Sequence, residues 1–198
     1  MPTTVASRLR ALLAVLLLIA IPVAAGAERS PAQVPSPVLV VGDSLAVGLE
    51  PHLGAMLQSD SVVWDARSGR TTPEGLVRLR ARLRELTPRT VVISLGTNDG
   101  PDPRRFASRI DRALQAIPAA DCVVWLDINR PPRKGRYEAL NRVLYEAAAH
   151  DRRLVVVHWD RAVLQGRVAL PDGLHPDEAG FRYRSRLIAN AVARGCHA

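Results

Sequence analysis

Two short segments far apart in the chain hold the residue types of a serine nucleophile and its base. Ser44 follows a short apolar run and opens a segment with helical spacing, while Asp172 precedes His175 by three residues. A turn at Gly173 can bring the Asp172 carboxylate onto Nδ1 of the imidazole, which fixes the tautomer and leaves Nε2 to take a serine proton. This pattern predicts acyl transfer by a serine, with His175 as the general base.

Each of these residues also has an ordinary structural explanation. Serine is a common N-cap, so Ser44 can simply begin a helix. Asp172 and His175 can likewise cap the helix that is expected after Pro176. The other histidines are less suited to act as the base, because they lie on expected helices, at a strand end beside a tryptophan or in the tail: His52, His150, His158 and His197.

An acyl-transfer site also needs N–H donors for the oxyanion that develops on the substrate. The Ser44 backbone N–H is one candidate. Gly69 is a second, because a glycine lets its backbone approach a ligand closely, and the side-chain amide of Asn98 is a third. Taken singly, Gly69 and Asn98 are equally well explained as turn residues, but all three donors follow expected strands.

The elements that must position these loops alternate between strand and helix along 198 residues, a length typical of one domain. Apolar runs predict strands at 38–41, 62–64, 91–95, 122–126 and 154–157. Helical spacing predicts helices over 44–58, 73–86, 103–117, 136–149 and 176–194. This alternation predicts a single three-layer α/β/α domain with a five-stranded parallel sheet, and ligands of such sheets bind beyond the carboxyl ends of the strands.

Four sequence blocks, in this order, resemble the SGNH (GDSL) hydrolase superfamily. They are Gly42-Asp43-Ser44-Leu45, Gly69, Gly96-Thr97-Asn98-Asp99 and Asp172-Gly173-Leu174-His175-Pro176. The resemblance covers nearly all of the chain from residue 38 onward and implies a flavodoxin-like SGNH-hydrolase fold. It also implies Ser44 as nucleophile, His175 as base and Asp172 as the acid that orients the base. It further implies an oxyanion hole made by the N–H groups of Ser44 and Gly69 and by Asn98. The α/β-hydrolase pattern fits worse, because Ala46 stands where that pattern needs a glycine.

The expected function is that of a secreted serine ester hydrolase, of the short bacterial type within this superfamily. Ser44 would attack an ester carbonyl, the alcohol would leave with a proton from His175, and water would release the acid. A sugar hydroxyl in place of water would make the protein an O-acyltransferase or acetyl-esterase of cell-wall polysaccharide. A non-catalytic module that binds an anionic polymer is a third possibility, which the complete triad disfavours. No metal or organic cofactor is expected, because the chain has two cysteines and none of the usual phosphate-loop, dinucleotide or zinc motifs.

The charge balance is basic and is carried almost entirely by arginine. The formal net charge is +8, and Lys134 is the only lysine. Basic residues gather after the fourth expected strand and around Gly69: Arg130, Arg133, Lys134, Arg136, Arg67 and Arg70. They favour an anionic ester, such as a lipid with a charged headgroup or a cell-wall polymer, with Arg130 and Arg133 as substrate contacts. The alternative is a solvated loop in an arginine-rich chain. A nucleic-acid partner is not expected, because export and an aromatic content of 4% argue against it.

The first 27 residues have the three parts of a secretory signal peptide. Arg8 and Arg10 precede a short apolar run, Pro22 breaks it, and Ala25-Gly26-Ala27 supplies the small residues of a cleavage site. Cleavage would then precede Glu28, and an uncleaved membrane anchor is the alternative. The protein is therefore expected to be secreted or to lie in the periplasm or cell envelope, with no membrane span after cleavage.

Residues 28–37 are rich in proline and predict a stiff linker, so the SGNH domain is expected to comprise residues 38–198. A domain of this size can bury a core of its own, and we expect a monomer. Export would place Cys122 and Cys196 in an oxidising compartment. Cys122 begins an expected strand, and Cys196 follows the last expected helix. Both positions lie at the same edge of the sheet, so we expect a disulfide between the two cysteines. The alternative is a buried free Cys122 and a frayed tail.

Overall fold

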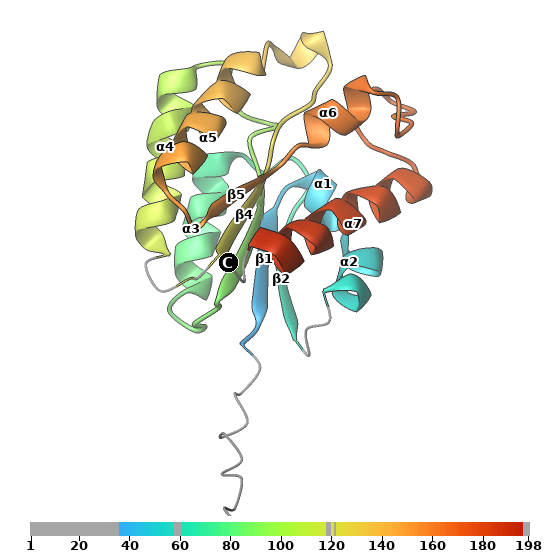
Figure 1. The fold of residues 1–198 in the computed structure, drawn as a ribbon. Coiled ribbons are helices and arrows are strands. Elements are labelled where there is room, and N and C mark those ends of the chain that lie inside the picture. Colours follow the sequence, from blue (N-terminus) through green and yellow to red (C-terminus); the bar gives the residue numbers. More distant parts are fainter. Residues whose placement is uncertain (1–35, 58–60, 118–119, 121, 196–198) are drawn as a thin grey trace, which may run out of the picture. The chain divides into compact units, whose positions relative to one another are not determined.

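The computed structural model describes residues 36–57, 61–117, 120 and 122–195. Within them, five strands form one sheet: β1 (Val38–Gly42), β2 (Val62–Ala66), β3 (Thr90–Ser94), β4 (Cys122–Leu126) and β5 (Leu154–Val157). The strand order is β2-β1-β3-β4-β5, and every neighbouring pair is parallel (Figure 1). The predicted five-stranded parallel sheet is therefore confirmed.

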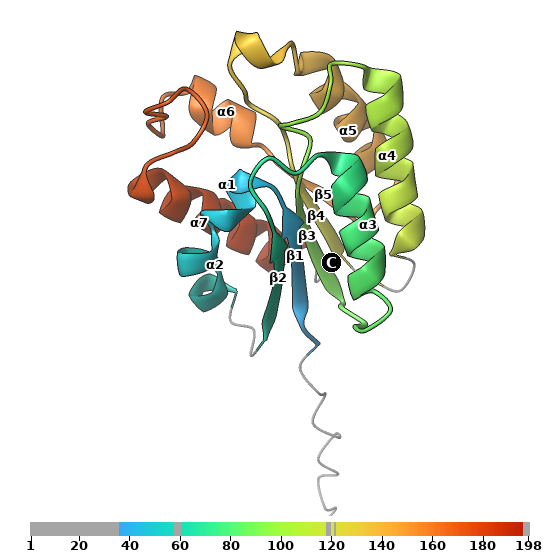
Figure 2. The same cartoon turned by 180° about the vertical axis from the view of Figure 1, so that it is seen from behind.

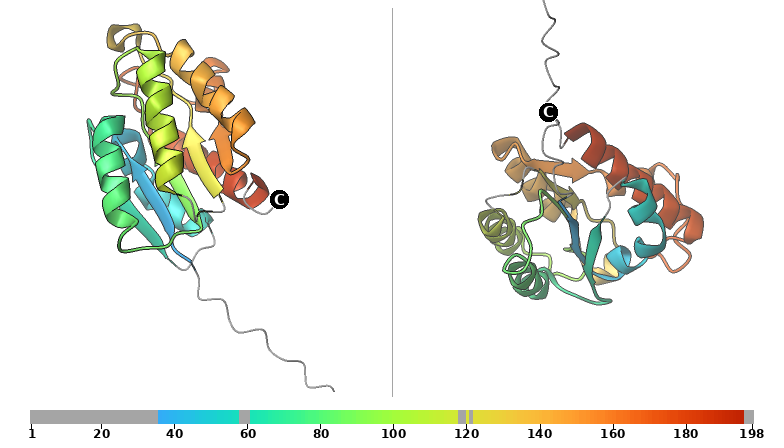
Figure 3. Two further views of the ribbon diagram at one scale, coloured as in Figure 1. Left: turned by 90° about the vertical axis from the view of Figure 1, so that its left-hand side faces the viewer. Right: turned by 90° about the horizontal axis from the view of Figure 1, so that it is seen from below.

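Helices cover both faces of this sheet, as Figure 2 and Figure 3 show. One face carries α1 (Ser44–Val47), α2 (Glu50–Met56) and α7 (Glu178–Gly195). The other face carries α3 (Thr72–Arg82), α4 (Pro103–Ala116) and α5 (Glu138–His150). The short helix α6 (Trp159–Leu164) and the 3-10 turn η1 (Pro132–Lys134) lie at the edge where the strands end (Figure 1). Ligands of doubly wound sheets bind at this edge, because the loops that follow the strands converge there.

Alternation along each strand divides the core into two layers. Leu39 of β1 faces the layer of α3, α4 and α5, while Val40 faces the layer of α2 and α7. In the first layer Phe106 packs edge-on against Trp125, with ring centroids 6.0 Å apart. Because both faces of the sheet are buried, the strands are continuous apolar runs in the sequence, which is why the pattern predicted them.

The helix expected over 44–58 is two short helices, because the chain turns at Gly48. A Cβ at Gly48 would lie 2.1 Å from the Phe181 ring of α7, so only a glycine lets this helix approach so closely. Pro51 then occupies the first turn of α2, where its missing N–H leaves no hydrogen bond unmade. The sequence did not predict α6 and η1, because six and three residues are too short to show a period.

The expected signal peptide, most of the expected linker and Cys196 lie outside the described residues. Cleavage, export and the disulfide therefore stay predictions. Cys122 is buried at the start of β4. Among the helices that the structure describes, none is long and apolar enough to cross a membrane.

We expect Gly42→Ala and Gly54→Ala to move stability in opposite directions. At Gly42 a Cβ would lie 2.2 Å from Ala46 Cβ and 2.9 Å from the Ser94 carbonyl oxygen, and this crowding should cost about 1–3 kcal/mol. At Gly54, within α2, no described atom beyond the adjoining residues and the helix's own backbone lies within 4 Å of the added Cβ, so alanine should stabilise the helix by about 0.5–1 kcal/mol. Denaturant unfolding measures both changes, and equal shifts would contradict the packing described at Gly42.

Candidate active site

Three side chains from two distant segments form a continuous hydrogen-bonded chain. Ser44 Oγ lies 2.8 Å from Nε2 of His175, and Nδ1 of His175 lies 2.7 Å from Oδ2 of Asp172. Oδ1 of Asp172 accepts from the backbone N–H groups of Leu174 at 2.9 Å and of His175 at 2.7 Å. Gly173 has a φ of 79°, the left-handed conformation that glycine adopts without strain. This turn holds the carboxylate against the imidazole, as expected from the sequence.

The Asp172 carboxylate stays ionised well into acidic pH. Its hydrogen bond with His175 is the largest cause, and the backbone N–H groups of the turn add to it, so the pKa of Asp172 lies far below its usual value. Both side chains are open to solvent, with exposed fractions of 38% for His175 and 55% for Asp172. The pair therefore lies at the surface of the sheet edge rather than in a closed cavity.

Ser44 is placed by the residue before it, at the point where β1 becomes α1. The Asp43 N–H donates to the Ser94 carbonyl oxygen of β3 at 3.0 Å, and Oδ1 of Asp43 accepts from the Leu45 N–H at 2.9 Å. Burial raises the pKa of Asp43 to about 6, against the opposing effects of the Leu45 N–H and the Arg184 charge. Since α1 has four residues, these bonds at the strand end, rather than a long helix dipole, position Ser44.

Gly69 lies in the turn that follows β2, and Arg70 ties this turn to β1. The buried Arg70 guanidinium places Nη2 2.9 Å from Oδ1 of Asp65, and Nη1 donates to the backbone oxygens of Asp65 and Gly42. Gly69 is exposed and has a φ of 75°, which again favours glycine. Arg70 was expected to face an anionic substrate, but it lies inside because Asp65 supplies its counter-charge.

Asn98 lies on the loop after β3, in contact with two neighbouring loops. Its Nδ2 donates to the Arg70 carbonyl oxygen at 3.2 Å, and its Oδ1 accepts from Lys134 Nζ at 3.1 Å. These two bonds fix the orientation of the amide, and the second Nδ2 hydrogen is not engaged by any described residue. The loops of Gly69, Ser44 and Asn98 follow β2, β1 and β3, which are adjacent in the sheet.

The chain matches the GDSL-like lipase/acylhydrolase family over residues 40–183, which include Ser44, Asp172 and His175. It belongs to that family. Esterase TesA from Pseudomonas aeruginosa is 36% identical over 173 residues, covering 77% of this chain and 84% of the relative. A crystal structure of TesA is 30% identical, with a TM-score of 0.69 over 81% of this chain and 99% of that chain. The C-terminal catalytic domain of peptidoglycan O-acetyltransferase A from Streptococcus pneumoniae shares the fold at 20% identity, with a TM-score of 0.65 over 81% of this chain and 94% of that domain.

Family membership confirms the resemblance to SGNH hydrolases that the four sequence blocks indicated. The protein is a carboxylic ester hydrolase of this type. Its five-stranded parallel sheet also has the arrangement of its structural neighbours.

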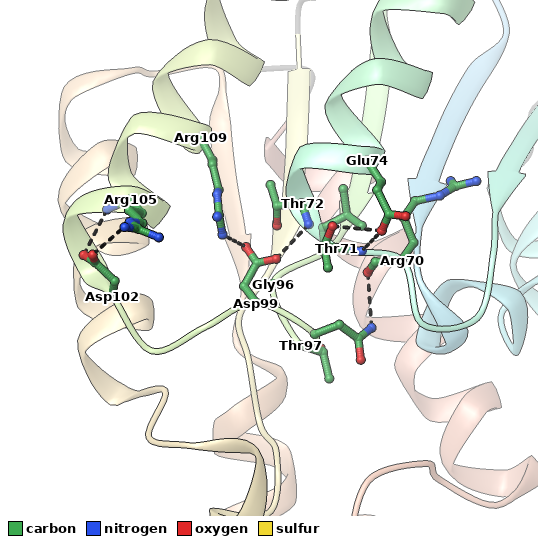
Figure 4. A network of polar contacts seen from close by, with 12 residues as sticks. Arg70, Thr71, Thr72, Glu74, Gly96, Thr97, Asp99, Asp102, Arg105 and Arg109 are labelled. Carbon is green, nitrogen blue, oxygen red and sulfur yellow. Dashed lines mark hydrogen bonds and ion pairs between the residues drawn. The ribbon is translucent and has the colours of Figure 1, made fainter.

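In this hydrolase a buried carboxylate holds the Asn98 loop against two helices. Asp99 accepts a hydrogen bond from the Thr72 N–H at the start of α3 (2.8 Å) and pairs with Arg109 of α4 (2.7 Å), as Figure 4 shows. Asp99 ends one of the four sequence blocks, yet no function was predicted for it. Its partners lie in two other elements, so no local pattern in the sequence could have identified them.

Arg130 holds the same loop from the end of β4, and its position corrects an expectation. Its guanidinium is buried and not open to a substrate, so the expected surface contact at Arg130 is not found. Over distances of 2.5–3.4 Å it donates to five backbone carbonyls, those of Gly96, Thr97, Asp99, Gly135 and Arg136. The planar group with five N–H donors suits such a set of acceptors, which is why an arginine occupies this position.

Arg133 and Lys134 are the basic side chains of this loop that lie exposed beside the candidate site. Arg133 Nη2 donates to the Asp172 carbonyl oxygen at 3.4 Å, while Lys134 contacts Asn98. The turn η1 therefore places two cations between the Asn98 loop and the Asp172 turn. Two other basic residues pair with carboxylates at the surface: Arg136 with Glu138 and Arg67 with Glu74.

A second histidine–aspartate contact lies at the ends of β4 and β5. His158, which follows β5 and precedes Trp159, is half-exposed, and its Nδ1 lies 3.4 Å from Oδ2 of Asp127. Asp127 also accepts from the Tyr145 hydroxyl at 2.6 Å and from the Asp160 N–H at 2.7 Å. These contacts connect α5 and α6 to the sheet. Within the described part of the chain, no three His, Cys, Asp or Glu residues are arranged to hold a metal ion.

We expect Arg130→Lys to lower stability and activity together. An ammonium group cannot reach five carbonyls, so the free energy of unfolding should fall by about 2–3 kcal/mol as buried acceptors lose their donor. Arg133→Lys is the matched control, because Arg133 is exposed and its one hydrogen bond to the described residues is long, so stability should change by less than about 0.5 kcal/mol. Denaturant unfolding measures the change in stability, and an ester hydrolysis assay measures the change in activity. Equal losses in both variants would refute the conclusion that Arg130 holds the Asn98 loop in place.

Proposed function

We propose that this hydrolase cleaves carboxylic esters through an acyl-enzyme on Ser44, with His175 as general base and Asp172 as the acid that orients it. The observation that carries the proposal is the unbroken hydrogen-bonded chain from Ser44 Oγ through His175 to Asp172. Membership of a lipase and acylhydrolase family supports the ester chemistry.

In the first step Nε2 of His175 takes the Ser44 proton while Oγ attacks the carbonyl carbon of the ester. The charged Asp172 stabilises the imidazolium that forms. When the tetrahedral intermediate collapses, the imidazolium gives its proton to the leaving alcohol. Water then attacks the acyl-enzyme with His175 again as base, which releases the carboxylic acid and restores Ser44. The scheme assigns every proton transfer to these side chains and requires no metal or organic cofactor.

The proposed oxyanion hole consists of the N–H groups of Ser44 and Gly69 and the side-chain amide of Asn98. The bonds of Asn98 to Arg70 and Lys134 set the amide before substrate arrives, so little reorganisation is needed as charge develops. The ammonium of Lys134 adds positive charge beside this amide.

The proposed location is outside the cytoplasm, on the evidence of the signal-like residues 1–27. Residues 28–37 then link this segment to an SGNH domain of residues 38–198 that acts as a monomer. A disulfide between Cys122 and Cys196 would close a long loop of this domain and stabilise it in an oxidising compartment.

Transfer of the acyl group to a sugar hydroxyl is a second candidate function. The fold shared with a peptidoglycan O-acetyltransferase domain favours it. Both functions use the same acyl-enzyme and differ in the acceptor, so their products separate them: free acid from hydrolysis and an O-acylated sugar from transfer.

We expect Ser44→Ala to abolish hydrolysis of p-nitrophenyl acetate, and Asp172→Asn to lower kcat by about 10²–10⁴-fold with little change in KM. The amide keeps the shape of the carboxylate but cannot stabilise the imidazolium. Asp111→Asn, an equal loss of charge at an exposed position of α4, is the matched control and should retain full activity. Phenylmethylsulfonyl fluoride should add its sulfonyl group to Ser44, as mass spectrometry of the peptide would detect. Full activity of Ser44→Ala would refute the proposal, and O-acylation of an added peptidoglycan oligosaccharide would favour transfer.

We also expect the double variant Arg133→Gln/Lys134→Gln to raise KM for an ester with a carboxylate or phosphate in its alcohol part by about tenfold, with little change for a neutral ester. The two cations lie beside the proposed oxyanion hole and would attract a negative group there. The matched control is Arg84→Gln/Arg152→Gln, which removes the same charge from exposed positions at the opposite edge of the sheet. Equal changes of KM for both esters, or in both double variants, would refute a preference for anionic substrates.

A further inference from the structure

A buried arginine on α7 takes no part in the mechanism described so far. Arg184 is 1% exposed, and its Nη2 donates to the Ser94 hydroxyl at 3.1 Å. The guanidinium lies over the ring of Trp159, 4.5 Å from its centroid. Nε and Nη1 have no hydrogen-bond partner among the residues that the structure describes. A charge held in this way inside a protein requires a compensating charge nearby.

The Asp43 carboxylate is also fully buried, and its negative charge favours the charged form of Arg184 without a direct ion pair between the two described side chains. Its Oδ2 has no hydrogen-bond partner in the described part of the chain. Ser94 links the two groups, because Arg184 donates to its hydroxyl and the Asp43 N–H donates to its backbone oxygen. Burial lowers the pKa of Arg184 to about 10, and the negative charge of Asp43 opposes that shift. Each group therefore favours the charged form of the other.

Asp43 lies next to Ser44 in the chain, and Arg184 lies in the helix that follows His175. Asp43 is the N-cap of α1, in which Ser44 is the first residue. Arg184 lies in α7, which begins three residues after His175 and packs beside α2 (Figure 1). A shift of α7 along the sheet would move His175 relative to Ser44, and the attraction between the buried charges opposes such a shift.

We propose that Arg184 is a positioning residue for ester hydrolysis: its buried charge and its bond to Ser94 hold α7 against the end of β3, so that Ser44 and His175 stay within hydrogen-bonding distance. This inference rests on the proposed function of Ser44 and His175. It gives α7, which lies outside the four sequence blocks, a role in positioning His175 relative to Ser44.

Other groups also act on the two buried charges. The Leu45 N–H of α1, the Thr97 side chain after β3 and the charged form of His175 all favour ionised Asp43. Asp127, after β4, favours charged Arg184. Arg184 is distinguished from the other groups facing Asp43 because it is buried and carries a full charge over the whole pH range of an activity assay.

The pH dependence of kcat/KM in Arg184→Met tests the proposal. Removing the positive charge raises the pKa of Asp43 further above its ordinary value, so the carboxylate becomes protonated at a higher pH. The kcat should fall at every pH, because α7 loses the attraction between the two buried charges. The fall should be greatest on the acid side, where the acid limb moves upward by about one pH unit. At pH 6 we expect kcat to fall by about 10- to 100-fold, with KM changed by less than about threefold. Arg184→Lys keeps the charge and should leave the acid limb in place.

Asp43→Asn provides the decisive comparison, because an amide does not titrate. Combined with Arg184→Met, it should remove the upward shift of the acid limb and raise Tm above that of Arg184→Met alone. Arg182→Met is the matched control on the same helix, because Arg182 is exposed and pairs with Glu178 at the surface, so it should behave as the wild type. If Arg184→Met does not fold, Arg184→Gln replaces it, since glutamine is neutral but keeps a donor for Ser94.

Two results would overturn the inference: wild-type kcat in the neutral variants of Arg184, or an acid limb that does not move in them. Failure of the proposed function is a separate result. It would appear as full activity of Ser44→Ala and no sulfonyl adduct on Ser44, whatever the properties of the Arg184 variants.

Discussion

The 2.8 Å hydrogen bond between Ser44 and His175 joins residues 131 positions apart in the chain, and the arrangement of the elements makes this contact possible. Parallel strands deliver the loops that follow them to one edge of the sheet, so Ser44, Gly69 and Asn98 reach that edge on three adjacent strands. His175 arrives on the turn before α7, which returns across the face that carries α1 and α2. The site therefore requires both the strand order and the docking of the last helix.

Three buried arginines hold the parts of this edge together. Arg70 joins the Gly69 turn to the end of β1, and Arg130 joins the Asn98 loop to the two residues that follow η1. Arg184 contacts the end of β3 from α7. A guanidinium suits these positions because it carries five donors in a plane and can bond several carbonyl oxygens at once. Part of the basic composition of the chain thus serves its architecture, while Arg133 and Lys134 remain exposed beside the candidate site.

Much of the fold could be predicted, because burial on both faces gives the strands of a parallel sheet uninterrupted apolar sequences. The helices after β2, β3 and β4 were likewise expected close to their observed positions. The expected helix over 44–58 was wrong in detail, since Gly48 allows α7 to approach and ends the first helical segment. That reason lies in Phe181, far along the chain, and no window of sequence around Gly48 contains it.

The sequence alone determined the family blocks, their order and the sheet edge at which their residues meet, because residue type and periodicity are local properties of the chain. It could not assign Arg70 and Arg130 to the interior. The local sequence around a loop arginine does not show whether its guanidinium faces solvent or a set of backbone carbonyls. The partners of Asp99 and the contacts of Arg184 with Ser94 and Trp159 were equally inaccessible. Only the tertiary structure decided these contacts, because each depends on the packing of elements that are distant in sequence.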